Sequence, residues 1–146
     1  MHETYEAHGI RFCYPRTWDV SESQEDNELT VSVHSPETSY WSVVIMLDRP
    51  DPAQVVESAV KVFRKEYDEI DVYLVEAGER DAVARDLEFV CYELLNSAFL
   101  RSFQTDGFTV LVLYQGNDRE LEETKQTLEA ISNSLQCEQE TDSPLW

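Results

Sequence analysis

Three histidines and two nearby glutamates have side chains whose chemistry would suit a metal ion. They are His2, His8 and His34, with Glu3 and Glu6 close to the first two in the sequence. Imidazole nitrogens and carboxylate oxygens are ligands of zinc and manganese. His2 and His8 lie in a terminal segment that we expect to be mobile, whereas a metal site needs ligands in a fixed geometry. The sequence therefore predicts no metal site and no cofactor.

The sequence contains none of the usual motifs for nucleophilic catalysis or for nucleotide binding. There is no Gly-x-Ser-x-Gly elbow, and none of the four glycines forms a phosphate-binding loop. The three cysteines, Cys13, Cys91 and Cys137, are widely spaced and contain no Cys-x-x-Cys pair. This pattern indicates reduced thiols rather than disulfides or a zinc site. Cys13 and Cys91 fall in apolar stretches, as small core residues do.

Acid-base catalysis by carboxylates is the one catalytic mechanism that these observations leave to consider. Glu88 and Glu93 lie in a region that we expect to be strands, and paired carboxylates can act as general acid and base. With 30 acidic residues in the chain, however, close pairs will occur by number alone. We predict no catalytic residue. A small-ligand-binding or carboxylate-based enzyme domain, using Arg101 in a cleft between sheet and helix, is the alternative.

Arg101 interrupts an apolar stretch and shares strand parity with Phe99 and Phe103. If Asn96-Ser97 is a two-residue hairpin turn, Tyr92 lies opposite Arg101 on the same face of the sheet. The guanidinium could then stack on the Tyr92 ring, an interaction worth roughly 0.5–2 kcal/mol. The sequence thus predicts a structural stacking pair, with a ligand anchor as the alternative.

Tyr40 and Trp41 are adjacent bulky aromatics at the start of an apolar run. Neighbouring residues of a regular strand point to opposite faces, so the two rings cannot line one pocket. We expect one ring in the core and the other near a helix edge or the end of the sheet. If the protein has a partner-binding surface, we place it at Tyr40 and Trp41, with Trp18 as a neighbour.

The charge balance excludes several classes of partner. Thirty Asp and Glu against 11 Lys and Arg give a formal net charge of −19, which opposes binding to nucleic acid or to an acidic membrane. The acidic clusters favour a solvated surface, with binding of a basic protein partner as the functional alternative. No apolar run approaches the ~18 residues of a membrane helix, and no signal-like segment opens the sequence. We therefore expect a cytoplasmic location.

Apolar periodicity and turn signals predict strands and two helices. Leu29, Val31 and Val33 alternate with polar residues, which is typical of a half-buried strand, and Tyr40 to Leu47 suits a central strand covered on both faces. Asp51 and Asn117 are expected helix caps, the second helix ending near Gln136. The other expected strands are 10–14, 18–21, 72–76, 87–95, 99–105 and 108–114, with turns at Asn96-Ser97 and Asp106-Gly107.

This element order predicts an α+β fold: a three-layer α/β/α sandwich with a largely antiparallel central sheet. Residues 1–136 form one domain, and residues 137–146 form an acidic tail. The sequence is compatible with a monomer or a homodimer. A homodimer would form through an exposed sheet edge or through Pro144-Leu145-Trp146, and could accompany either function.

One segment resembles a known family. In "GIRFCYPRTWDV", Tyr14-Pro15 followed by Trp18 resembles the opening strand and corner of the PsbP and Mog superfamily, and "LEAISNSLQ" is similar to its ending. By element order the resemblance covers residues 9 to 136. It implies an α/β/α sandwich that binds other proteins, since its members include a photosystem II extrinsic subunit and a Ran-binding import factor. It carries over no catalytic residue, and thus implies a non-enzymatic binding or assembly module.

Overall fold

A computed structural model of the chain describes residues 1–76 and 82–137. These residues form two helices, α1 (Pro52–Glu66) and α2 (Asp118–Ser134). The strands are β1 (His2–Ala7), β2 (Ile10–Pro15), β3 (Asp19–Glu25), β4 (Glu28–His34), β5 (Tyr40–Met46), β6 (Ile70–Val75), β7 (Val83–Cys91), β8 (Leu94–Gln104), β9 (Thr109–Asn117) and β10 (Gln136–Cys137).

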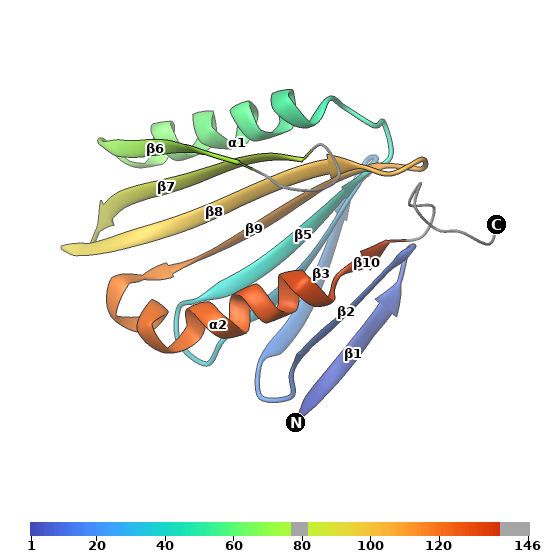
Figure 1. Ribbon diagram of the computed structural model, residues 1–146, viewed down its shortest axis with the longest axis horizontal. Helices are drawn as coiled ribbons and strands as arrows, with labels where there is room; N and C mark the ends of the chain where they lie inside the picture. Colours follow the sequence, from blue (N-terminus) through green and yellow to red (C-terminus); the bar gives the residue numbers. More distant parts are fainter. Residues whose placement is uncertain (77–81, 138–146) are drawn as a thin grey trace.

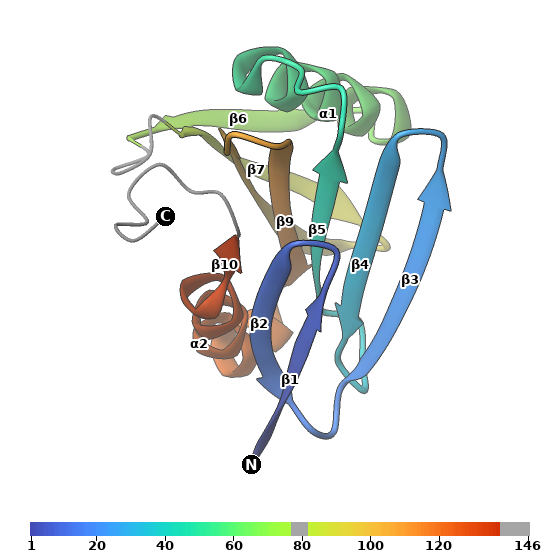
Figure 2. The same ribbon diagram turned by 90° about the vertical axis from the view of Figure 1, so that its right-hand side faces the viewer.

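Seven strands form one antiparallel sheet in the order β3-β4-β5-β9-β8-β7-β6, and the other three form a small sheet in the order β1-β2-β10. Helix α1 packs on β7, β8 and β9, whereas α2 packs on β2, β5, β8 and β9. The two helices lie on opposite faces of the large sheet (Figure 1). β2 and β10 lie beside α2, with β1 on the other side of β2 (Figure 2). The antiparallel α+β class is thus confirmed. The outer layer on the α2 side is shared between a helix and strands, which the expected α/β/α layering did not include.

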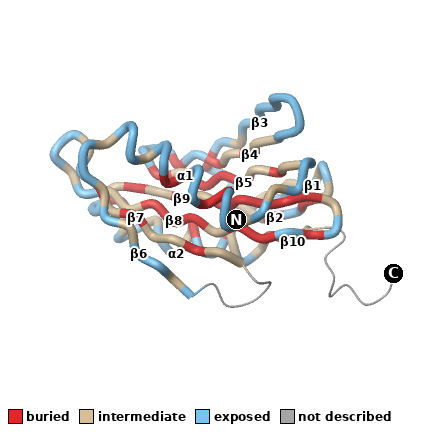
Figure 3. Tube along the Cα trace, turned by 90° about the horizontal axis from the view of Figure 1, so that it is seen from above, coloured by how far each residue is buried: buried red, intermediate tan, exposed pale blue. Residues whose placement is uncertain are grey.

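Two separate cores follow from the alternation of side chains along the strands. On β9, Val110, Val112 and Tyr114 join the core beneath α2, whereas Leu111 and Leu113 face α1. Such alternation is what a strand covered on both faces requires. The buried positions run along the central strands, while β3 and β6 at the two ends of the large sheet contain no buried residue (Figure 3). The two end strands of the large sheet are therefore more accessible to solvent than its central strands.

Both helices begin where the sequence predicts. Asn117 accepts a hydrogen bond from the Glu120 backbone N–H at 2.9 Å, as an N-cap does. Asp51 occupies the cap position of α1 and Pro52 follows it, but the Asp51 side chain makes no capping hydrogen bond. Val56 and Val60 on α1 and Leu128 and Ile131 on α2 are buried, so the predicted apolar stripes face the sheet.

The N-terminal segment is a strand and not the mobile terminus that the sequence led us to expect. His2 to Ala7 pair with Ile10 to Pro15 in an antiparallel hairpin. Tyr5 stacks on Phe12 with ring centroids 5.0 Å apart, and the Tyr5 hydroxyl donates a hydrogen bond to Glu22. Alternating exposed and half-buried residues, which the polar composition obscured, place one face of this strand on the core.

The C-terminal boundary also differs from the expected one. Cys137, which we assigned to the acidic tail, pairs with Ile10 in β10. The rest of the expected tail, with Pro144-Leu145-Trp146, lies outside the described residues. Cys13, Cys91 and Cys137 are half-buried, and no disulfide joins any two of them, as expected of reduced thiols next to a core. No helix of the described chain is long and apolar enough to span a membrane.

Candidate functional site

The β7–β8 hairpin turns four residues earlier than predicted. Its tip is Tyr92-Glu93, with φ of 51° and 66°, and Asn96-Ser97 lie inside the eleven-residue strand β8. Positive φ at both tip residues is the geometry of the tight hairpin turns, but Asn and Gly, not Tyr and Glu, are its usual sequence signal. The expected turn at Asp106-Gly107 is present between β8 and β9.

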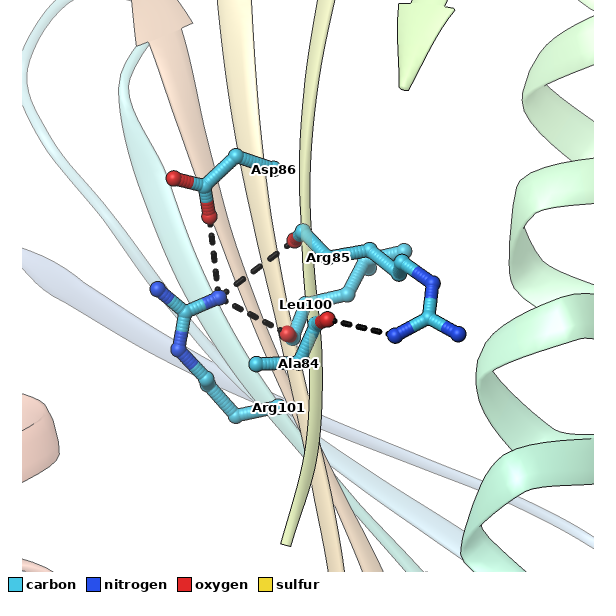
Figure 4. A network of polar contacts seen from close by, with 5 residues as sticks. All are labelled: Ala84, Arg85, Asp86, Leu100 and Arg101. Carbon is cyan, nitrogen blue, oxygen red and sulfur yellow. Dashed lines mark hydrogen bonds and ion pairs between the residues drawn. The ribbon is translucent and has the colours of Figure 1, made fainter. Parts of the chain in front are cut away.

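This register separates the predicted stacking pair. Tyr92 is 95% exposed at the hairpin tip, while Arg101 lies opposite Ala84 on β7 and Val112 on β9. The prediction that Arg101 stacks on Tyr92 is therefore wrong. The Arg101 guanidinium instead pairs with Asp86 at 3.0 Å and donates to the carbonyls of Arg85 and Leu100 (Figure 4). Arg101 faces the α2 side and is held by the sheet itself.

The aromatic residues that we expected at a partner surface lie mostly in the core. Trp41 is fully buried, its ring is 4.7 Å from that of Phe12, and its Nε1 donates to Ser132 Oγ at 2.8 Å. Trp18 is buried in the same core. Neither ring is exposed enough to anchor a partner in this conformation, and α2 packs on β5, the strand that carries Trp41.

Tyr40 points away from Trp41, as alternation along the strand requires. Its hydroxyl donates to Gln115 Oε1 at 2.8 Å, and burial, followed by the neighbouring Tyr67 and Glu66, raises the pKa of Tyr40 to about 12. The neutral phenol is thus the form present at physiological pH. Tyr40 is half-buried and remains the only member of the predicted trio with access to solvent.

The histidines are distributed over separate elements. His2 lies in β1, His8 in the turn that follows, and His34 at the end of β4, with its ring 5.7 Å from that of Tyr40. Within residues 1–76 and 82–137, no group of three or more His, Cys, Asp or Glu is arranged to hold a metal ion.

Glu120 is a buried carboxylate at the start of α2. It accepts hydrogen bonds from the Ser35 hydroxyl at 3.1 Å, from the Thr38 backbone N–H and hydroxyl at 3.0 and 2.6 Å, and from the Ser39 backbone N–H at 2.7 Å. Burial alone would raise the pKa of Glu120, but the hydrogen bonds from Thr38 and Ser39 lower it below its usual value. A carboxylate with all its partners inside the protein holds the β4–β5 loop in place; it is not free to act on a substrate.

One surface combines exposed apolar and acidic side chains. We call it the β6–β8 face: the α2-side surface at the outer end of the large sheet, carried by β6, β7 and the start of β8. Strand parity places the following residues on it: Asp71, Tyr73, Asp86, Glu88, Val90 and Leu95. Tyr73, Val90 and Leu95 are all exposed there. Large apolar side chains gathered on one exposed patch are a usual mark of an interaction surface.

A hollow of about 450 Å³ lies at this face. Four carboxylates line it, from Asp68, Glu69, Asp71 and Glu88, together with Val90 and Leu95. None of the described residues that line the hollow is basic. Asp71 lies directly opposite Glu88 across the β6–β7 pair, and like charges in that position destabilise a sheet. A positively charged group in the hollow would relieve this repulsion.

Tyr73 and Glu88 are the polar pair of the β6–β8 face. The Tyr73 hydroxyl donates to Glu88 Oε1 at 2.8 Å. This hydrogen bond to a carboxylate raises the pKa of Tyr73, so the phenol keeps its proton. The pair can therefore present a carboxylate, an aromatic ring and apolar side chains together, which suits a basic peptide segment better than acid-base chemistry.

Sequence reasoning missed this face for an identifiable reason. The acidic residues from Glu66 to Asp71 looked like a solubilising cluster, and Val90 and Leu95 were assigned to one continuous strand. In the structure Val90 and Leu95 face each other across the β7–β8 hairpin near its tip. Exposed apolar residues on either side of a hairpin turn would have indicated this patch. Because the turn was predicted four residues too late, the sequence did not show that Val90 and Leu95 lie together.

Comparison with known proteins identifies the fold. No protein-family model and no curated protein matches the sequence. The solution structure of cyanobacterial PsbP (CyanoP) from Synechocystis sp. PCC 6803 matches with a TM-score of 0.62 and 17% identity, over 93% of this chain and 92% of that chain. LpqN, involved in cell envelope biogenesis of Mycobacterium tuberculosis, matches with a TM-score of 0.49 and 12% identity, over 92% and 89% of the two chains. The chain therefore has a PsbP-like fold.

Proposed function

We propose that this protein is a small non-enzymatic accessory or assembly protein that binds another protein through the β6–β8 face. The observation that carries the proposal is the exposure of Tyr73, Val90 and Leu95 beside an acidic hollow. Apolar and aromatic side chains supply the energy of a protein interface, and the charged rim selects the partner. With a formal net charge of −19, the protein would favour a basic surface.

We extend this proposal to the layering of the fold, the location and the oligomeric state. The fold would be a three-layer α/β/α sandwich of the PsbP and Mog superfamily, supported by the two helices on opposite faces of the sheet. We also propose a cytoplasmic location and a monomer in the absence of partner. Tyr40, the solvent-accessible member of the predicted aromatic trio, is proposed as a secondary contact only, because it lies outside the β6–β8 face.

A second candidate function is binding of a small apolar ligand. A hollow of about 310 Å³ lies between the β1–β2 hairpin and α2, lined by Cys13, Tyr14, Ala130 and Ile131 among others. Its size is at the lower end of the range for small-molecule sites. Changes at the β6–β8 face would leave this hollow intact, so the two functions can be separated.

A pair of matched double variants tests the proposed face. We expect Val90→Ser with Leu95→Ser to weaken binding of the natural partner at least about tenfold, because each serine removes apolar area from the interface. The partner would be identified by affinity purification with the unmodified protein, and its dissociation constant measured by calorimetry with each variant.

The control is Val62→Ser with Leu47→Ser. Val62 on α1 and Leu47 after β5 are 57% and 58% exposed, close to the 63% of Val90, but lie on other surfaces. This control should bind the partner like the unmodified protein. Equal binding by the two double variants would mean that the partner contacts another part of the chain.

A further inference from the structure

The large sheet has two end strands with opposite character. β3 has the sequence DVSESQE and is almost entirely exposed, with Asp19, Glu22 and Glu25 along it. Charged side chains on an end strand discourage the addition of another strand. The β3 edge is therefore protected in the way that natural sheets commonly use.

β6, at the other end, has less of this protection, because Asp71 is its one charged residue. Its sequence is IDVYLV, and among the described residues it pairs only with β7. Tyr73 is exposed, and Leu74 is 78% exposed on the opposite face of the same strand. An end strand with apolar side chains and an unpaired edge is a template for a further strand. Within residues 1–76 and 82–137, one edge of the sheet therefore carries three acidic side chains, while the other carries one and is open to a further strand.

The acidic hollow lies next to this open edge. Asp68 and Glu69 immediately precede β6, Asp71 lies on it, and Glu88 faces it from β7. A strand added beside β6 would alternate its own side chains between the two sheet faces. On the Asp71 and Tyr73 face its side chains would meet carboxylates, and on the Leu74 face they would meet apolar groups.

We propose that β6 accepts an extended segment of the partner protein as an eighth strand, and that this segment alternates basic and apolar residues. The inference rests on the proposed function and names how the partner binds. Main-chain hydrogen bonds would supply affinity, and the alternating side chains would supply specificity. A second copy of this chain is the less suitable occupant, because each copy carries a formal net charge of −19.

A synthetic peptide tests the proposal directly. The probe is a capped, fluorescently labelled peptide of alternating lysine and valine, compared with the same peptide in which every backbone amide is N-methylated. Both carry equal charge, but the second cannot donate main-chain hydrogen bonds. We expect the methylated peptide to bind at least about tenfold more weakly by fluorescence anisotropy at about 0.15 M salt, where long-range attraction is screened. The unmodified peptide should also slow hydrogen exchange at β6 amides.

Two lysine substitutions locate the binding. Leu74→Lys adds the kind of residue that blocks sheet edges, and should weaken binding of the unmodified peptide at least about tenfold. Leu47→Lys makes the same change in charge at an exposed leucine elsewhere, and should change binding less than about threefold.

Three outcomes would overturn the proposal that β6 accepts a strand of a partner protein. The first is equal affinity for both peptides with unchanged exchange at β6, which would mean charge attraction only. The second is no binding of the unmodified peptide. The third is concentration-dependent self-association in sedimentation that Leu74→Lys abolishes, which would make a second copy the occupant. In the first two cases the test with the natural partner can still succeed, so the proposed function and the strand-addition mode fail separately.

Discussion

Trp41→Ala is expected to lower the free energy of unfolding by about 3–5 kcal/mol, the usual cost of removing a buried tryptophan side chain. Trp41 is fully buried, contacts Phe12, and bonds Ser132 through its indole nitrogen. The substitution leaves a cavity between the sheet and α2 and an unpaired hydroxyl on Ser132. Urea denaturation followed by circular dichroism measures the change.

Two further variants show how much of this loss comes from the hydrogen bond and how much from burial of the ring. Ser132→Ala removes only the hydrogen bond and should cost about 1 kcal/mol. Tyr92→Ala removes an aromatic ring that is 95% exposed and should change stability by less than about 0.5 kcal/mol. If Trp41→Ala unfolded at the same urea concentration as the unmodified protein, the ring would not be in the core, and its role as a partner anchor would be favoured again.

Glu120→Gln is expected to cost about 2–3 kcal/mol at pH 7. The carboxylate accepts hydrogen bonds from Ser35, Thr38 and Ser39, whereas an amide offers one accepting oxygen and turns two donors toward groups that also donate. Glu122, two residues further along α2, is exposed, so Glu122→Gln is the matched control and should be nearly neutral. An equal loss in both variants would indicate a general charge effect at the helix N-terminus.

The cost of Glu120→Gln should depend on pH. The pKa of Glu120 is lowered in the folded protein below its usual value of 4.5, so the ionised form is favoured by folding. The stability that this provides is fully present above the pKa of the unfolded chain and is lost as the pH falls through the folded pKa. The difference between the unmodified protein and Glu120→Gln should therefore shrink below about pH 4.5. A constant difference from pH 7 to pH 3 would contradict the role of the ionised carboxylate.

Local patterns were sufficient to predict much of the fold. The alternation of Val31 and Val33, the two-sided apolar run from Tyr40, and the Asn117 cap each depend on residues close in sequence, and each element forms where it was expected. The sequence also predicted that Tyr40 and Trp41 point apart. These features follow from chain geometry and do not depend on which strands become neighbours.

The errors concern strand pairing over longer distances. Asn96-Ser97 has turn chemistry, yet Asn96 pairs with Phe89 and Asn117, because the pairing of Leu87, Ala98 and Leu100 in the core sets the register. Tyr92 and Glu93 then take positive φ to close the hairpin. Likewise, β1 is polar in composition and becomes a strand only because β2 pairs with it.

The candidate site was the least predictable feature. The β6–β8 face depends on the register of β7 with β8 and on the region that α2 covers, neither of which the sequence reveals. The sequence did place an acidic cluster at Asp68, Glu69 and Asp71 and raised a basic partner as an alternative. What it could not show is that exposed Val90 and Leu95 lie next to these carboxylates.

The central claim is that another protein binds at the β6–β8 face, and site-specific photo-crosslinking in cells that naturally make this protein tests it most directly. A benzophenone amino acid would replace Val90 in one variant and Leu47 in a second, and crosslinked products would be identified by mass spectrometry. We predict a crosslink from position 90 to one specific protein and none to that protein from position 47. No protein adduct from position 90, or the same adducts from both positions, would contradict the claim.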